Sequence, residues 1–123
     1  MATSTTTLAV EDFWHDGKRE WVEGTITVNA GDYAAGGLIV DFTTLPQVKS
    51  SLVPNNASVI IWGVGGFMYA YENGTTIANG KMMVFAETTV GTNQPLLEYT
   101  NTAASAGLLA DVIRFRAKFK ALR

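Results

Sequence analysis

Hydrophobic and polar residues alternate most regularly near the end of the chain, between residues 113 and 120. Apolar side chains occupy one parity, at Ile113, Phe115, Ala117 and Phe119. Cations occupy the other parity, at Arg114, Arg116, Lys118 and Lys120, which we call the basic row. Successive side chains of a strand point to opposite faces. The pattern therefore predicts a strand with one apolar face and one face that carries four positive charges.

The same period of two recurs in residues 19–30, where Val22, Gly24, Ile26 and Val28 share one parity. Shorter apolar or alternating runs predict further strands at 38–43, 58–63, 67–72, 75–77, 81–87 and 96–99. The run at 58–63 is continuously apolar, so we expect Trp62 to lie in the core. Residues 101–110 fit either a loop or a single helical turn.

Turns rich in glycine and asparagine separate these runs, and Asn73-Gly74 is a strong hairpin signal. No long helical pattern lies between them. The spacing predicts an all-β fold, a single-domain antiparallel β-barrel or β-sandwich of jelly-roll-like type. The length of 123 residues suits one domain, which we place at residues 11–123.

Residues 1–10 are rich in threonine, which favours an extended backbone, and we expect them to form an N-terminal arm. Two interpretations stay open, a flexible tail and an arm that clasps a partner. In the second, the candidate interface residues of the arm are Thr5, Thr6, Thr7 and Leu8.

Charge is sparse and unevenly distributed. Charged residues make up 16% of the chain, against roughly 25% in ordinary soluble domains. Residues 111–123 hold five cations and one acid, a charge of +4, whereas residues 1–110 hold four cations and ten acids, a charge of −6. This division favours a basic row that pairs with an acidic surface of a sister subunit or another protein. A merely solvated face is the competing interpretation.

The sequence offers little support for catalysis or for a cofactor. It has no cysteine, and His15 is its only histidine, flanked by Asp12 and Asp16 in what we expect to be a solvated turn. Gly63-Val64-Gly65-Gly66 precedes an aromatic strand instead of a helix, so a tight turn is expected in place of a nucleotide loop. We therefore predict a protein that is not an enzyme and that binds no metal or cofactor.

The sequence also bears on three other partners, which are nucleic acid, a membrane and a sugar. Single-strand binders place cations and aromatic rings on one face, whereas Phe115 and Phe119 lie opposite the basic row, so no nucleic-acid partner is expected. No apolar run approaches the roughly 20 residues of a membrane span, and the first residues lack the features of a signal peptide. A sugar-stacking platform could draw on aromatic residues at Trp14, Trp21, Trp62, Tyr33 and Tyr99, although such residues more often fill a core or an interface.

The order of four features resembles a known group of proteins. A Lys18–Val28 strand precedes a Tyr33 and double-glycine loop, and an aromatic meander over 66–74 precedes the closing strand. This order resembles small structural proteins of tailed-bacteriophage virions, especially head decoration or cement proteins. The dense basic row departs from the apolar closing strand that is common in that group.

The resemblance implies a non-enzymatic β-protein, commonly a homotrimer, that binds the major capsid protein on the outer head surface and stabilises the shell. It also implies synthesis in the host cytoplasm and a final location on the virion. Two alternatives stay open, a tail or fibre component of the same kind of virion and a carbohydrate-binding β-domain.

Overall fold

The computed structural model describes residues 3–15, 19–48, 58–86, 97–99 and 106–120. Its elements in these ranges are β1 (Thr6–His15), β2 (Arg19–Val28), β3 (Leu38–Val40), the 3-10 helix η1 (Phe42–Thr44), β4 (Val59–Trp62), β5 (Met68–Glu72), β6 (Gly80–Ala86), β7 (Leu97–Glu98), α1 (Ala106–Ala110) and β8 (Ile113–Lys120). The expected Asp16-Gly17 turn lies outside the described residues.

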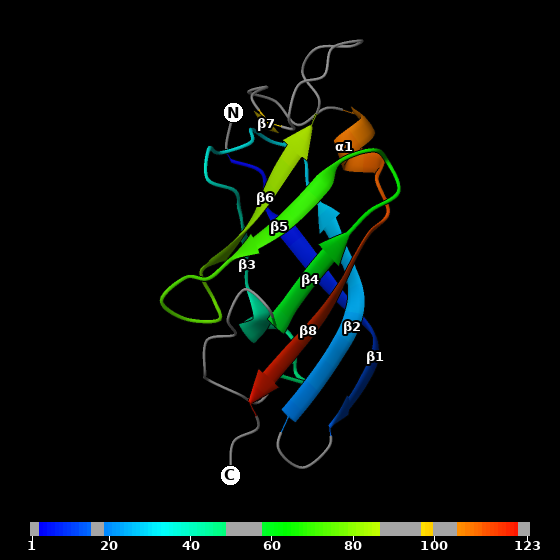
Figure 1. Cartoon of the computed structure of the whole chain (residues 1–123), viewed down its shortest axis with the longest axis vertical. Coiled ribbons are helices and arrows are strands. Elements are labelled where there is room, and N and C mark those ends of the chain that lie inside the picture. The colour runs from blue at the N-terminus through cyan, green and yellow to red at the C-terminus, as the bar shows by residue number, and fades with distance from the viewer. Residues whose placement is uncertain (1–2, 16–18, 49–57, 87–96, 100–105, 121–123) are drawn as a thin grey trace.

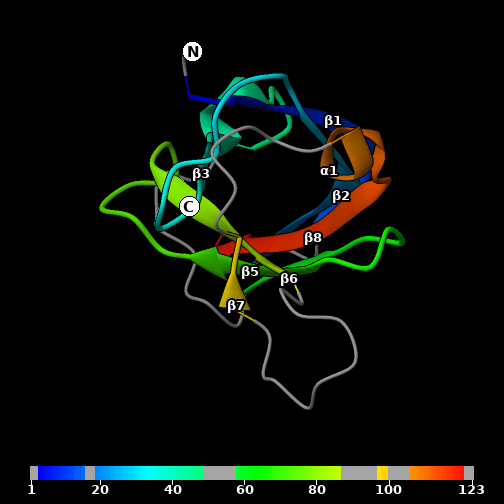
Figure 2. The same cartoon turned by 90° about the horizontal axis from the view of Figure 1, so that it is seen from above.

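The strands form two antiparallel sheets (Figure 1). The first sheet has the strand order β1-β2-β8-β4. The second has the order β3-β6-β5, and β7 pairs with the last residues of β6. Seen from above, the two sheets enclose the interior from opposite sides, and neither closes into a barrel (Figure 2). The predicted all-β antiparallel architecture is therefore confirmed at this level.

Alternation in the central strands builds the core. Along β2 every second residue from Glu20 to Val28 is buried, and β8 buries Ile113, Phe115, Ala117 and Phe119 as predicted. Phe42 of η1 lies between the sheets, with its ring centroid 5.7 Å from that of Phe115 and 5.1 Å from that of Phe119. Full burial of such a side chain stabilises the fold by roughly 1.5–3 kcal/mol.

The glycine-rich turn between β4 and β5 is built around Asp111. The Val64 amide donates to Asp111 Oδ1 at 3.0 Å, and the Tyr69 hydroxyl donates to Asp111 Oδ2 at 2.5 Å. A Cβ atom at Gly63 would lie 2.3 Å from Asp111 Oδ2, so a side chain there would displace the Asp111 carboxylate from this position. The expectation of a tight turn at this sequence agrees with this geometry, and the turn leads the chain from the first sheet to the second.

A second carboxylate fixes the loop before β3. The Tyr33 hydroxyl and the Gly36 amide both donate to Glu98 Oε2, each at 2.7 Å. The Val84 amide donates in turn to the Tyr33 hydroxyl at 3.1 Å. Burial, joined by the nearby carboxylate, raises the pKa of Tyr33 to about 12. These bonds connect the loop, β6 and β7.

Three local predictions need correction. Residues 75–77 form no strand and belong to the turn between β5 and β6, where Asn79 Oδ1 accepts from the Thr76 amide. The strand expected at 38–43 ends at Val40, because Asp41 caps η1 through the Thr43 amide. Residues 106–110 take the helical alternative as α1.

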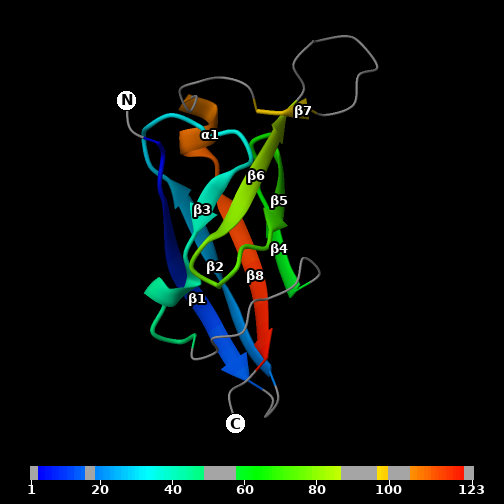
Figure 3. The ribbon, with the colours of Figure 1, turned by 90° about the vertical axis from the view of Figure 1, so that its left-hand side faces the viewer.

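The structure also differs from the prediction in the N-terminal arm. This comparison covers residues 3–10, which are the arm residues that the structure describes. β1 starts at Thr6 and continues past residue 10, so the expected boundary between arm and domain falls inside a strand. The Asn29 side chain donates to the hydroxyls of Thr5 and Thr7, and the Thr6 hydroxyl donates to the Ile39 carbonyl at 2.7 Å. These bonds hold β1 against both β2 and β3, which lie beside it in Figure 3.

Candidate functional site

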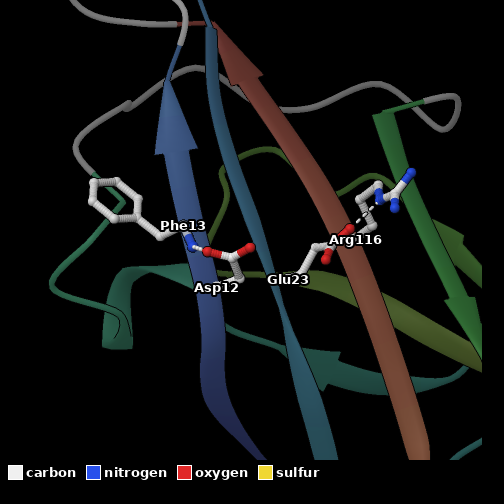
Figure 4. Close-up of polar contacts among 4 residues, drawn as sticks. All are labelled: Asp12, Phe13, Glu23 and Arg116. Atoms are coloured by element: carbon white, nitrogen blue, oxygen red, sulfur yellow. Dashed lines mark hydrogen bonds and ion pairs between the residues drawn. The ribbon is translucent and has the colours of Figure 1, made fainter.

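The basic row lies on the outer face of the first sheet, away from the core. Arg114 and Arg116 are exposed on β8 and Lys118 is half-buried, whereas the side chain of Lys120 lies outside the described residues. Figure 4 shows this face with Arg116 beside Glu23 of the neighbouring strand β2. The predicted alternation of β8 is therefore confirmed over its described side chains.

Two arginines of the basic row pair with acids of the same chain. Arg116 Nε donates to Glu23 Oε1, and these residues are direct cross-strand neighbours of β8 and β2. Arg114 Nη1 donates to Glu11 Oε1 of β1, two strands away. A bulge in β1 between Val10 and Asp12 adds Glu11 to the strand, and bulges of this kind redirect a side chain. Much of the charge that sequence reasoning assigned to an external partner is thus matched within the sheet.

The third cation of the basic row meets an aromatic ring. Lys118 Nζ lies 5.6 Å from the ring centroid of Trp21, a distance at which cation–π attraction operates. Trp21 in turn stacks on Trp14 of β1, with centroids 5.7 Å apart and ring planes 5° apart. Lysine and the two indoles therefore form one row across β8, β2 and β1.

All three tryptophans of the chain lie on this outer face, which we call the tryptophan face. Trp62 was expected in the core, and that prediction is wrong because 42% of its surface is exposed. β4 pairs on one side only, with β8, and alternates Val59 and Ile61 inward with Ile60 and Trp62 outward. A continuously apolar run is typical of a strand buried on both faces, but here the second face of β4 meets solvent.

Cations and aromatic rings do share the tryptophan face, contrary to the expectation from β8 alone. Phe115 and Phe119 do point away from the cations, as expected, but neighbouring strands supply tryptophans to the cation face. What disfavours phosphate binding is the charge balance, because Glu11 and Glu23 already pair with the two arginines. The alternation of side chains along β1, β2 and β4 shows which residues of each strand share a face. This signal locates the tryptophan face only when the strand order is also known.

The tryptophan face contains a hollow. A hollow of about 230 Å³ is lined by Trp62, Arg114, Glu11 and Glu23, with Gly24 and Phe115 contributing from buried positions. The five aromatic residues that the sequence suggested as a sugar-stacking platform do not share one surface. Tyr33 and Tyr99 are buried and pack edge to face, with centroids 5.3 Å apart, so they take no part in this surface.

The four candidate residues of the arm come together elsewhere. Thr5, Thr6, Thr7 and Leu8 line a groove of about 620 Å³ between β1 and β3, which we call the threonine groove. Ile39 and Lys81 lie on its opposite wall. The structure therefore separates the sequence candidates into two groups, the basic row on the tryptophan face and the threonines at the junction of the sheets.

The outer face of the second sheet is mostly apolar, and sequence reasoning did not single it out. The outward positions of β3, β5 and β6 are occupied by Ile39, Met68, Ala70, Glu72, Lys81, Met83 and Phe85. Glu72 and Lys81 face each other at one end, and the remaining positions of this apolar face are hydrophobic. Ile39 and Met68 expose 54% and 57% of their surface.

Comparisons with protein-family models, with curated proteins and with solved structures find no match to this chain. In the ranges that the structure describes, no three acidic or histidine side chains gather as metal ligands would. The same ranges contain no helix of the length and apolarity that a membrane span requires.

Proposed function

We propose that the chain is a non-enzymatic structural protein of a tailed-bacteriophage virion, a decoration protein that binds the outer surface of the head and braces the shell. The apolar face of the second sheet carries this proposal. Outer faces of antiparallel sheets are usually polar where they meet water, and exposed apolar patches mark protein contacts. Met68 and Ile39 expose more than half of their surface on a face that is otherwise rich in Met83, Phe85 and Ala70.

The threonine groove extends this contact surface. Ile39 and Lys81 belong both to the outward side of the second sheet and to the wall of the groove. Thr5, Thr6, Thr7 and Leu8 on the opposite wall therefore adjoin the apolar face. In this proposal the major capsid protein contacts the apolar face, and a sister subunit of a homotrimer approaches along the groove. Three linked copies would make weak individual contacts effective.

In this proposal the basic row is not the surface that attaches the protein to a partner, although its charge alone suggested that role. Because Arg114 and Arg116 pair with Glu11 and Glu23, attachment does not need an acidic partner surface. The two facing sheets with a shared core support the sandwich alternative of the predicted architecture, and we propose a β-sandwich in place of a barrel.

Binding to purified heads tests the proposal. The protein is expected to co-sediment with emptied, expanded heads of the phage that encodes it, and Met68→Glu is expected to reduce the bound fraction at least several-fold. Val112→Glu changes a residue of similar exposure, 50% against 57% for Met68, outside the apolar face and serves as the matched control. Strictly monomeric sedimentation together with no binding to heads would refute the proposal. Immunogold labelling on tails instead of heads would favour the tail or fibre alternative.

A further inference from the structure

The hollow beside Trp62 combines an aromatic wall with charged groups at its rim. Trp62 belongs to the edge strand β4, and its half-exposed indole forms one wall. Gly24 lies beneath, where a Cβ atom would be 1.9 Å from the Ala9 carbonyl oxygen, so this position cannot carry a side chain. The bulge in β1 places Glu11 on the rim. The hollow is therefore built by specific backbone features of three strands.

The chemistry of the lining suits a polyhydroxylated ring. An indole offers a flat apolar surface on which the C–H face of a sugar can stack. Two carboxylates in the lining, those of Glu11 and Glu23, accept hydrogen bonds, and the guanidinium group of Arg114 has five N–H donors. In each ion pair the contact uses one carboxylate oxygen, Oε1, and one guanidinium nitrogen. The second carboxylate oxygen and the remaining guanidinium N–H groups can therefore form hydrogen bonds with hydroxyls at the edge of a sugar ring.

The charge balance decides which sugars fit. Arg114 pairs with Glu11 inside the lining, and Glu23 pairs with Arg116, which lies outside it, so each charged group of the hollow is already neutralised by a partner. An acidic sugar or a phosphate would have to displace a carboxylate from its arginine and would then face two negative groups. A neutral sugar avoids that cost and only exchanges hydrogen bonds with water for hydrogen bonds with the lining.

The remainder of the tryptophan face offers room for a longer chain of sugars. Lys118 and Arg114 are four residues apart on β8, which is about 13 Å at the rise of a strand. The stacked Trp14 and Trp21 lie beside Lys118, at the opposite end of the face from Trp62. A second aromatic surface therefore stands at a distance that one sugar residue does not span.

We propose that the tryptophan face binds neutral oligosaccharides, with one sugar residue stacked on Trp62 in the hollow that Glu11, Glu23 and Arg114 line. This inference does not depend on the capsid proposal, because it uses the outer face of the opposite sheet. Neutral glycans on the surface of a host cell or in an extracellular matrix are ligands of this chemical class.

Nuclear magnetic resonance titration of the full chain tests the inference. The probes are neutral tetrasaccharides of glucose, mannose, galactose and N-acetylglucosamine, selected on an array of neutral glycans, with oligogalacturonate as the anionic comparator. At least one neutral probe is expected to cause saturable shifts in β4, β8 and β1, and oligogalacturonate is expected to cause none.

Variants locate the site. Trp62→Ala is expected to weaken binding about tenfold or more, which is the loss of roughly one aromatic stacking contact. Trp62→Phe should retain part of the affinity, and Met68→Ala on the second sheet should retain all of it. Absence of saturable shifts with every neutral glycan, unchanged binding by a folded Trp62→Ala protein, or preference for the anionic comparator would each overturn the inference. None of these results affects head binding.

Discussion

Arg116 and Glu23 are direct cross-strand neighbours on β8 and β2, and they form an ion pair on the outer face of the first sheet. The sequence places these residues 93 positions apart. The excess of cations in the last strand and the excess of acids in the body of the chain thus meet within one sheet. Opposite net charges in two segments of the sequence therefore do not imply separate acidic and basic regions on the surface.

A charge swap tests this pairing. Arg116→Glu places two carboxylates opposite each other and should lower the free energy of unfolding by about 1 kcal/mol, because like charges at paired positions repel. The double variant Arg116→Glu with Glu23→Arg should recover most of the loss, measured by urea unfolding. Both side chains are partly exposed, so the coupling should shrink as salt is added. Additive effects of the two substitutions would contradict a direct pair.

Two buried tyrosines provide a matched comparison. The Tyr69 hydroxyl donates to Asp111, whereas the Tyr71 hydroxyl is buried and has no hydrogen-bond partner in the part of the chain that the structure describes. Tyr69→Phe should therefore cost about 1–3 kcal/mol, since it leaves Asp111 Oδ2 without the donor that it has in the native protein. Tyr71→Phe should be neutral or slightly stabilising, because it removes an unsatisfied polar group. Thermal and urea unfolding of both variants would decide, and equal losses would count against these contacts.

Much of this fold follows from local patterns, because β2 and β8 alternate strictly and each buries one parity. Parity does not reveal which strands become neighbours. Trp62 was misplaced because it lies on the outward parity of β4, and an apolar run does not show that this face of the sheet is left uncovered. Glu11 was missed because it reaches Arg114 only through the bulge in β1. The pairing of strands that are distant in the sequence determines which side chains lie together on the surface. A single sequence gives little information on such pairing.

Stability should fall in alkali. Burial raises the pKa of Tyr33 from 10.0 to about 12, and burial also raises the pKa values of Tyr69 and Tyr71. Below pH 10 both the folded and the unfolded chain hold these protons, so this stabilisation is fully present there. As pH rises further, the unfolded chain loses its protons first, which favours unfolding.

The free energy of unfolding should therefore decline between about pH 10 and pH 12, by up to about 1.4 kcal/mol per pH unit for each such tyrosine. Urea unfolding across this window measures the slope, and Tyr69→Phe should reduce it. A slope that is the same in the Tyr69→Phe variant would show that this phenol does not contribute.

The tryptophan face can be probed by fluorescence, because every tryptophan of the chain lies on it. Trp14 and Trp62 expose about two fifths of their surface, at 39% and 42%, while Trp21 is half-buried against Trp14 and Lys118. Acrylamide, a neutral quencher, should therefore quench a large part of the emission of the folded protein. Trp62→Phe should lower the quenchable fraction more than Trp21→Phe does. If quenching is weak in the native protein and strong only after unfolding, this face is covered in solution, and the contact surface of the assembly lies on the first sheet and not on the second.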